Sequence, residues 1–118
     1  MSYIDGFLLA VPTANRGAYT AKAEGMVPFF KDHGALKVVE CWGDDVPDGE
    51  QTSFPMAVKA EPGETVVFAW VAWPSKDARN AGMKAMQEDP RFKAMDMSGM
   101  PFDAKRMMFG GFEVIVDA

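Results

Sequence analysis

The sequence predicts an α+β protein that forms one domain over residues 1–118, built on an antiparallel sheet with helices on one face. Three observations support this prediction. The length is enough for a single domain with a closed core. Hydrophobic residues make up 48% of the chain and charged residues 25%, which is the balance of a globular protein. Stretches with strand-like and helix-like patterns follow one another in the order β-α-β-β-α-β.

The first part of the chain is predicted to form a strand and then a helix. Residues 3–11, YIDGFLLAV, are rich in aromatic and branched side chains, which is typical of a strand. Thr13 is expected to cap a helix over residues 14–33, and Gly34 is expected to end it in the left-handed conformation. The apolar residues that recur at helical spacing define the face expected to be buried: Tyr19, Ala23, Met26, Val27 and Phe30.

Two further strands are predicted at residues 36–43, LKVVECWG, and residues 64–73, ETVVFAWVAW. The polar sequence DDVPDGEQ, which contains proline and glycine, predicts a loop after the first of them. Residues 53–60 lie between this loop and the second strand. Their pattern fits a short helix capped by Ser53, and their length also fits a strand.

The last part of the chain is predicted to contain a second helix and a final strand. Ser75 is expected to cap a helix over residues 76–89. Small side chains on its predicted buried face would let it lie close to a sheet: Ala78, Ala81, Gly82, Ala85 and Met86. Residues 89–106 are expected to be irregular or to form a short helix, and residues 107–118, MMFGGFEVIVDA, to form the strand.

This order of elements predicts a ferredoxin-like fold. Reading each strand with a period of two separates its residues into two sets. One set is almost wholly apolar and is expected to meet the helices: Ile4, Leu8, Ala10, Val39, Cys41, Val67, Ala69, Val71, Phe112, Val114 and Val116. The other set mixes aromatic residues with carboxylates: Tyr3, Asp5, Phe7, Val38, Glu40, Trp42, Phe68, Trp70, Phe109 and Glu113. Because a face in water would not carry so many large aromatic side chains, a second copy is expected to cover it, sheet against sheet about a two-fold axis.

Glycines interrupt the first and last strands, which are neighbours in a ferredoxin-like sheet. Gly6 lies in the first strand, and Gly110 and Gly111 lie in the last. Glycine inside a strand commonly marks strong coiling or close approach of another group. We expect the pair to provide the curvature that a half-barrel needs, with space for a ligand as the alternative.

Charge and hydropathy exclude several classes of partner. The formal net charge of -5 argues against nucleic-acid binding, which depends on a basic surface. Residues 66–73 form the longest apolar run, which is too short to cross a bilayer as a helix. The start of the sequence, MSYIDGFLL, lacks the features of a secretory signal, and the single Cys41 cannot form an internal disulfide. A cytoplasmic protein is expected.

Several stretches together resemble one protein family. They are YIDGF, HGALKVVECWGDDVPDG, SFPMAVKAE, ETVVFAW, DPR and MPFDAKRMMFGGF. The chain resembles the bacterial domain of unknown function 1428 family over almost its whole length. The resemblance implies a dimeric α/β barrel, in which two ferredoxin-like sheets enclose a shared interior, and it implies no established reaction.

The wider fold group that this resemblance implies includes cofactor-free monooxygenases, haem-degrading proteins and small isomerases. Fold alone does not carry function, so these activities are analogies. Relatives are also sometimes associated with the RNA of a signal recognition particle. The acidic charge of this chain argues against direct RNA binding.

The carboxylates of the second set are candidates for proton transfer. Glu40 and Asp5, with Glu113 nearby, would lie among aromatic side chains, where burial raises a carboxyl pKa toward a useful value. The alternative is that they pair with lysine or arginine across the dimer, or reach water at a strand end. The aromatic residues expected to line the same cleft as ligand-binding residues are Trp42, Phe68, Trp70 and Phe109.

The remaining chemical candidates each have a structural alternative. His33, the only histidine, lies in the last turn of a helix and could complement the helix dipole or act as a base or haem ligand. Arg106 could pair with Asp103 or bind an anionic ligand. Cys41 is expected to pack in the core. No metal or cofactor is expected, since the acidic loop of residues 44–50 fits no calcium-loop pattern.

Two functions stay open. One is a homodimer that binds a small, partly apolar molecule in an aromatic and carboxylate-lined cleft, as a cofactor-free oxygenase or isomerase-like enzyme with Glu40, Asp5 or His33 as catalytic residues. The other is a non-catalytic dimeric interaction module whose aromatic face serves only to join the two copies.

Overall fold

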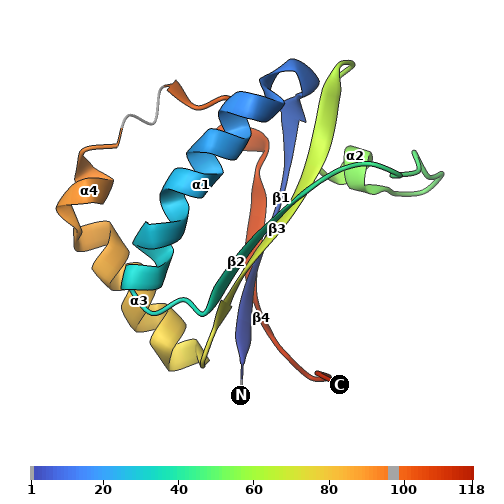
Figure 1. The fold of residues 1–118 in the computed structure, drawn as a ribbon. Helices are drawn as coiled ribbons and strands as arrows, with labels where there is room; N and C mark the ends of the chain where they lie inside the picture. The colour runs from blue at the N-terminus through green and yellow to red at the C-terminus, as the bar shows by residue number, and fades with distance from the viewer. Residues whose placement is uncertain (1, 96–98) are drawn as a thin grey trace.

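The computed structural model describes residues 2–95 and 99–118 as one antiparallel sheet with helices packed on one side (Figure 1). Its elements are β1 (Tyr3–Pro12), the 3₁₀ turn η1 (Thr13–Asn15), α1 (Arg16–Asp32), β2 (Lys37–Trp42), α2 (Phe54–Ala57), β3 (Glu64–Trp73), α3 (Lys76–Glu88), α4 (Pro90–Lys93), the 3₁₀ turn η3 (Ala104–Arg106) and β4 (Met108–Glu113). The strand order is β2-β3-β1-β4, with every neighbouring pair antiparallel. The predicted α+β, ferredoxin-like fold is confirmed.

Serine caps begin both helices that follow a loop, as predicted. The Ser53 side chain accepts a hydrogen bond from the backbone N–H of Met56 at 3.1 Å, so residues 53–60 contain the short helix α2 and not a strand. The Ser75 side chain accepts one from the backbone N–H of Ala78 at 3.0 Å, which begins α3. None of the helices in the described part of the chain could span a membrane.

The C-terminal end of α1 matches the prediction, whereas its N-terminal end does not. Gly34 follows the helix with a φ of 104°, the left-handed conformation expected of it. Thr13 does not cap the helix, because its hydroxyl lies 2.7 Å from that of Thr65 and the chain first forms the turn η1.

Two predictions for the last part of the chain have different outcomes. The predicted last strand ends earlier than expected, at Glu113. In the segment predicted to be irregular or a short helix, residues 96–98 lie outside the described residues.

The pairing register determines which side chains share a face of the sheet. Tyr3 lies opposite Trp73 on β3, and Asp5 lies opposite Val71. We name the side packed against α1 and α3 the helix-covered face: Tyr3, Asp5, Phe7, Leu9, Val11, Val38, Glu40, Trp42, Val67, Ala69, Val71, Trp73, Phe109 and Glu113. The opposite side is the open face: Ile4, Gly6, Leu8, Val39, Cys41, Phe68, Trp70, Met108, Gly110 and Phe112.

The prediction of which set meets the helices is right for β3 and wrong for the other strands. On β3, Val67, Ala69 and Val71 face the helices as expected. On β1 and β2 the carboxylate-bearing set does so, because Asp5 and Glu40 each have a hydrogen-bond partner on a helix. The prediction is wrong for β4 in the same way, because its pairing register aligns its residues with those of β1. Both sets are largely apolar in these strands, so alternation alone does not distinguish the sides.

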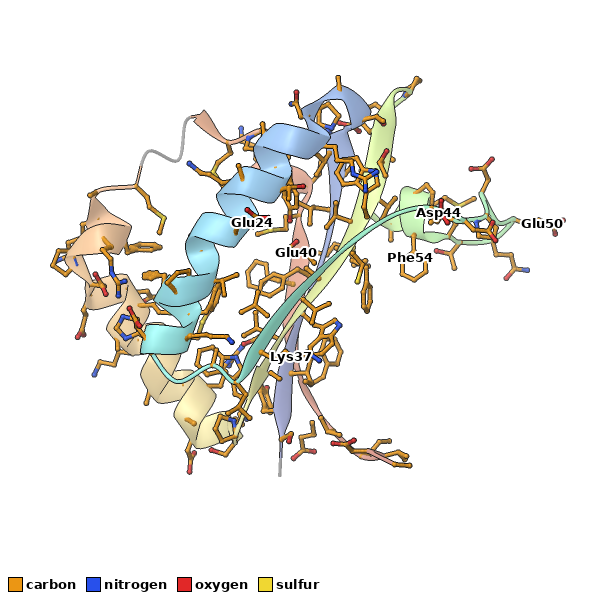
Figure 2. All side chains as sticks on the ribbon, viewed as in Figure 1. Glu24, Lys37, Glu40, Asp44, Glu50 and Phe54 are labelled. Carbon is orange, nitrogen blue, oxygen red and sulfur yellow. The ribbon has the colours of Figure 1, made fainter. Side chains whose placement is uncertain are left out.

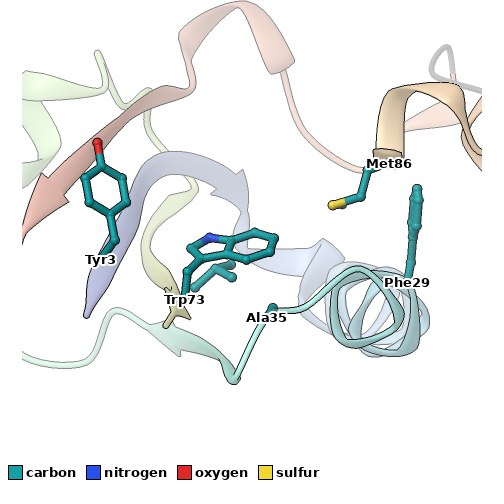
Figure 3. Close-up of a cluster of buried hydrophobic side chains, with 6 residues drawn as sticks. Tyr3, Phe29, Ala35, Trp73 and Met86 are labelled. Atoms are coloured by element: carbon teal, nitrogen blue, oxygen red, sulfur yellow. The ribbon is translucent and has the colours of Figure 1, made fainter. Parts of the chain in front are cut away.

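The main core cluster joins the sheet to both long helices (Figure 3). Trp73 is completely buried at its centre, and Tyr3, Phe29, Ala35, Val71 and Met86 surround it. Gly82 brings α3 close to the sheet, since a Cβ at that position would lie 2.6 Å from the Trp73 ring. The predicted small-residue face is therefore confirmed at Gly82, whereas Ala81 is exposed. Phe29 is a core residue that the helical pattern missed.

The glycines of β1 and β4 make room for aromatic rings of the same chain. A Cβ on Gly111 would lie 2.7 Å from Cε2 of the Tyr3 ring, which is too close. Space for a ligand is therefore the wrong interpretation at Gly111. Gly6 and Gly110 lie opposite each other, and the Phe112 ring is within ordinary contact distance of both, at 3.5 and 3.6 Å from the added Cβ positions.

Replacing Gly111 and Gly110 separately should have different effects on stability. Gly111→Ala forces the buried Tyr3 ring to move, and we expect it to lower the free energy of unfolding by about 1–3 kcal/mol. Gly110→Ala, its matched control, gains only ordinary contacts and should change that free energy by less than about 0.5 kcal/mol. Urea unfolding measures both. Equal effects of the two substitutions would show that Tyr3 does not require a glycine at position 111.

Candidate functional site

A groove of about 430 Å³ lies between α1 and β2 and contains the best candidate for a functional site (Figure 2). β2 is an edge strand, so one wall of the groove opens to solvent. Ala23 and Val27 of α1, with Val38 and Val67 of the sheet, provide apolar surface. Charged and polar groups come from the same two elements.

Tyr19 and Glu40 form the polar centre of the groove. The Tyr19 hydroxyl donates a hydrogen bond of 2.6 Å to Oε1 of Glu40. Tyr19 is buried because it lies on the face of α1 that meets the sheet, and Glu40 points toward it from the helix-covered face of β2. The other carboxylate oxygen, Oε2, has no hydrogen-bond partner among the described residues. It is therefore available to a bound molecule.

The environment changes the acidity of both groups. Burial raises the pKa of Glu40 above its ordinary value, and the hydrogen bond from Tyr19 acts in the opposite direction by stabilising the carboxylate. Burial also raises the pKa of Tyr19, as do its hydrogen bond to Glu40 and the charge of that carboxylate. Tyr19 thus stays a neutral donor, and the pKa of Glu40 lies above that of an ordinary glutamate.

Arg16 and Trp42 form the mouth of the groove. The Arg16 guanidinium lies 5.4 Å from the centre of the Trp42 ring, a cation–π arrangement. Arg16 makes no salt bridge with any residue that the structure describes. The groove therefore combines apolar walls with the carboxyl groups of Glu40 and Glu24 and one cation, Arg16.

Asp5, a predicted catalytic residue, lies away from this groove in a buried ion pair. It is only 4% exposed, and Arg79 of α3 binds both of its oxygens at 2.8–3.1 Å. The Trp73 indole N–H donates a fourth hydrogen bond to Asp5, at 2.9 Å. The hydrogen bonds to Asp5 raise the pKa of Arg79 and keep it charged. Asp5 thus pairs with a basic residue, as the alternative interpretation expected, but the partner lies in its own chain and not across a dimer.

His33 and Arg106 also contact carboxylates of the same chain. His33 Nε2 lies 2.8 Å from Asp89, whose pKa is lowered by hydrogen bonds from Arg91 first and His33 second. Arg106 binds Glu64 through two hydrogen bonds of 2.7 Å and Asp103 through one of 3.1 Å. The predicted Asp103 pair is present, and Glu64 is the partner that sequence spacing did not suggest.

The aromatic residues predicted to share one cleft lie on different surfaces. Trp42 borders the groove on the helix-covered face, whereas Phe68 and Trp70 lie on the open face. Phe109 is on the helix-covered side of β4 but is 73% exposed. Glu113 is exposed at the end of β4. The predicted single cleft is therefore wrong.

Three further observations concern predicted or missed residues. Cys41 is exposed on the open face, so its predicted place in the core is wrong. Sequence reasoning missed Arg16 and the role of Tyr19, although a tyrosine on a buried helix face needs a partner for its hydroxyl. Within residues 2–95 and 99–118, no three or more His, Cys, Asp or Glu side chains are placed to hold a metal ion.

Comparison with known proteins gives the family and the fold. Residues 2–104 match the family described as "Protein of unknown function (DUF1428)". The chain is 54% identical to the uncharacterized protein YbaA of Escherichia coli K12, and equally to that of Shigella flexneri, over 99% of both chains. A crystal structure of a dimeric ferredoxin-like protein from an uncultured marine organism is similar, with a TM-score of 0.59 and 10% identity over 99% of this chain and 98% of that one. This chain belongs to the DUF1428 family.

Proposed function

We propose that this protein binds a small, partly apolar molecule in the groove between α1 and β2, with Glu40 as the group that accepts or donates a proton. The observation that carries this proposal is the hydrogen bond of 2.6 Å between Tyr19 and Glu40 inside that groove. A volume of about 430 Å³ is in the range of small-molecule sites, which are mostly apolar with few polar groups.

The chemistry follows from the roles of the three polar groups. Tyr19 positions Glu40 and stabilises its charged form, so the carboxylate can take a proton at Oε2 from a bound molecule and return it. Arg16 offers a positive charge at the mouth, suited to a carbonyl or anionic group of the same molecule. Proton transfer between two positions of one substrate, as in an isomerase, or activation of a substrate toward oxygen needs no more from the protein than such a base.

We also propose that the working form is a homodimer joined through the open face. Phe68 is 47% exposed on that face, and Met108 and Phe112 are 44% and 61% exposed. Phe54 of α2 packs against Phe68 with ring centres 6.3 Å apart, which extends the apolar surface. Two such faces bury each other when two copies pack about a two-fold axis. The dimeric state of the marine ferredoxin-like protein supports this proposal.

A non-catalytic dimeric interaction module is the second candidate. The open face favours it, since that surface explains dimerisation without any ligand. The two candidates differ in whether the groove between α1 and β2 is occupied.

A cytoplasmic location is consistent with both candidates. Cys41 is exposed and free. A reducing compartment keeps such a thiol from forming disulfides between chains.

Native mass spectrometry of freshly purified protein tests the occupied groove. We expect a dimer that carries an added mass of roughly 200–400 Da, the size such a groove admits. Ala23→Leu fills part of the groove and should lose the added mass. Ala81→Leu, on the exposed surface of α3, is the matched control and should keep it. A dimer without added mass, or equal loss in both variants, would favour the interaction module.

An NMR pH titration of the glutamate carboxyl carbons tests the role of Glu40. Its pKa should lie above the ordinary glutamate value, and that of Glu64 should lie below it because of Arg106. Tyr19→Phe should raise the pKa of Glu40 further, since it removes the hydrogen bond that favours the charged form. Tyr3→Phe, which does not touch Glu40, should leave it unchanged. If Glu40 and Glu64 had the same pKa, Glu40 would lose its assignment as the proton-transfer group.

A further inference from the structure

The side chains that line the groove between α1 and β2 follow one another in a fixed order. Arg16, the first residue of α1, lies over the ring of Trp42, the last residue of β2. Tyr19, about one helical turn later, bonds to Glu40, which comes two residues earlier in β2. The two elements are therefore antiparallel along the groove, and Figure 1 shows α1 running toward the start of β2.

The groove is polar at one end and apolar at the other. Arg16 and Trp42 border the polar end, and Val27 and Val38 line the apolar end. Val27 lies eleven residues after Arg16, roughly 16 Å along the helix axis. Val38 lies four residues before Trp42, roughly 13 Å along the strand. A bound molecule therefore meets a cation first, then the carboxyl group of Glu40, and then apolar walls.

Arg16 differs from the other arginines in having no carboxylate partner within the described chain. Arg79, Arg91 and Arg106 each pair with a carboxylate, at 2.8, 2.9 and 2.7 Å. The Arg16 guanidinium instead lies 5.4 Å from the centre of the Trp42 ring. Stacking on an aromatic ring uses the flat face of a guanidinium and leaves the N–H groups at its edge for a planar anion such as a carboxylate.

Two carboxylates also line the groove, Glu40 and Glu24. Like charges repel, so neither favours an anionic group beside it. Glu24 is exposed and lies eight residues after Arg16, roughly 12 Å along the helix, which exceeds the screening length of roughly 8 Å at physiological ionic strength. Glu40 lies two residues from Trp42, roughly 7 Å along β2. A negative group is therefore best accommodated at the Arg16 end, where the charge is positive.

We propose that the groove binds a carboxylic acid lengthwise, with its carboxylate on the Arg16 guanidinium and its apolar end between Val27 and Val38. This proposal rests on the proposed function and names its class of substrate. Glu40 then faces the middle of the molecule, several bonds away from the bound carboxylate. The proton that Oε2 takes from this middle part returns to the same molecule, so the step needs no further reactant.

Three probes that differ in charge test the role of Arg16: phenylbutyrate, phenylbutyramide and phenylbutylamine. NMR titration of the full chain, followed at the Trp42 indole N–H, gives a dissociation constant for each. We expect phenylbutyrate to bind most tightly. Arg16→Gln should weaken its binding at least about fivefold and that of the neutral amide less than about twofold, because charge-assisted hydrogen bonds are the stronger ones. Lys22→Gln removes a charge from the exposed surface of α1 outside the groove and should leave both constants unchanged.

The outcomes separate this proposal from the proposed function. Equal losses for the acid and the amide in Arg16→Gln would overturn the carboxylate assignment and leave the groove as a binding site. An amine that binds more tightly than the acid would do the same, and would assign the site to Glu40 and Glu24. If none of the three probes shifts a groove resonance at millimolar concentration, both the binding groove and this proposal are overturned.

Nuclear Overhauser effects between probe and protein test the direction of binding. Bound phenylbutyrate should show effects from its phenyl protons to the methyl groups of Val27 and Val38. Effects from the phenyl protons to the Trp42 ring instead would place the apolar end beside Arg16 and overturn the proposed direction.

Discussion

The buried ion pair between Asp5 and Arg79 determines which side of the sheet faces the helices. Asp5 is almost fully buried on the central strand β1, and a buried carboxylate is tolerated only when its oxygens are hydrogen-bonded. Arg79 of α3 and the Trp73 indole supply those bonds at once. A shift of β1 by one residue would turn Asp5 to the open face and leave Arg79 without its partner.

The same constraint separates the two surfaces that carry the proposed functions. With Asp5 beneath α3, the register places Glu40 of β2 on the helix-covered face, where it meets Tyr19 and borders the groove. It also places Phe68 and Phe112 on the other side, with no helix of the described chain except α2 beside them. One small sheet can then offer a site for a small molecule and a surface for a second copy without competition between them.

Local features of the sequence were sufficient to predict the fold but not the site. The strands, the caps at Ser53 and Ser75 and the left-handed Gly34 depend on residues close in sequence, and the structure confirms them. The sides of the strands depend on pairs far apart, since Asp5 and Arg79 are separated by 74 residues. The predicted cleft therefore mixed residues from both faces. Glu40 and Trp42 are the two predicted residues that the groove retains, and Tyr19 and Arg16 entered only with the packing of α1.

The three tryptophans report separately on the open face, the groove and the core. Trp70 lies on the open face, Trp42 borders the groove, and Trp73 is in the core. The most direct measurement is the fluorine NMR spectrum of protein labelled with 5-fluorotryptophan, recorded as the proposed dimer is diluted to monomer. The account predicts that the Trp70 resonance shifts most and that Trp73 does not move. Dissociation that leaves Trp70 unchanged and shifts Trp42 instead would show that the copies meet at the groove and not at the open face.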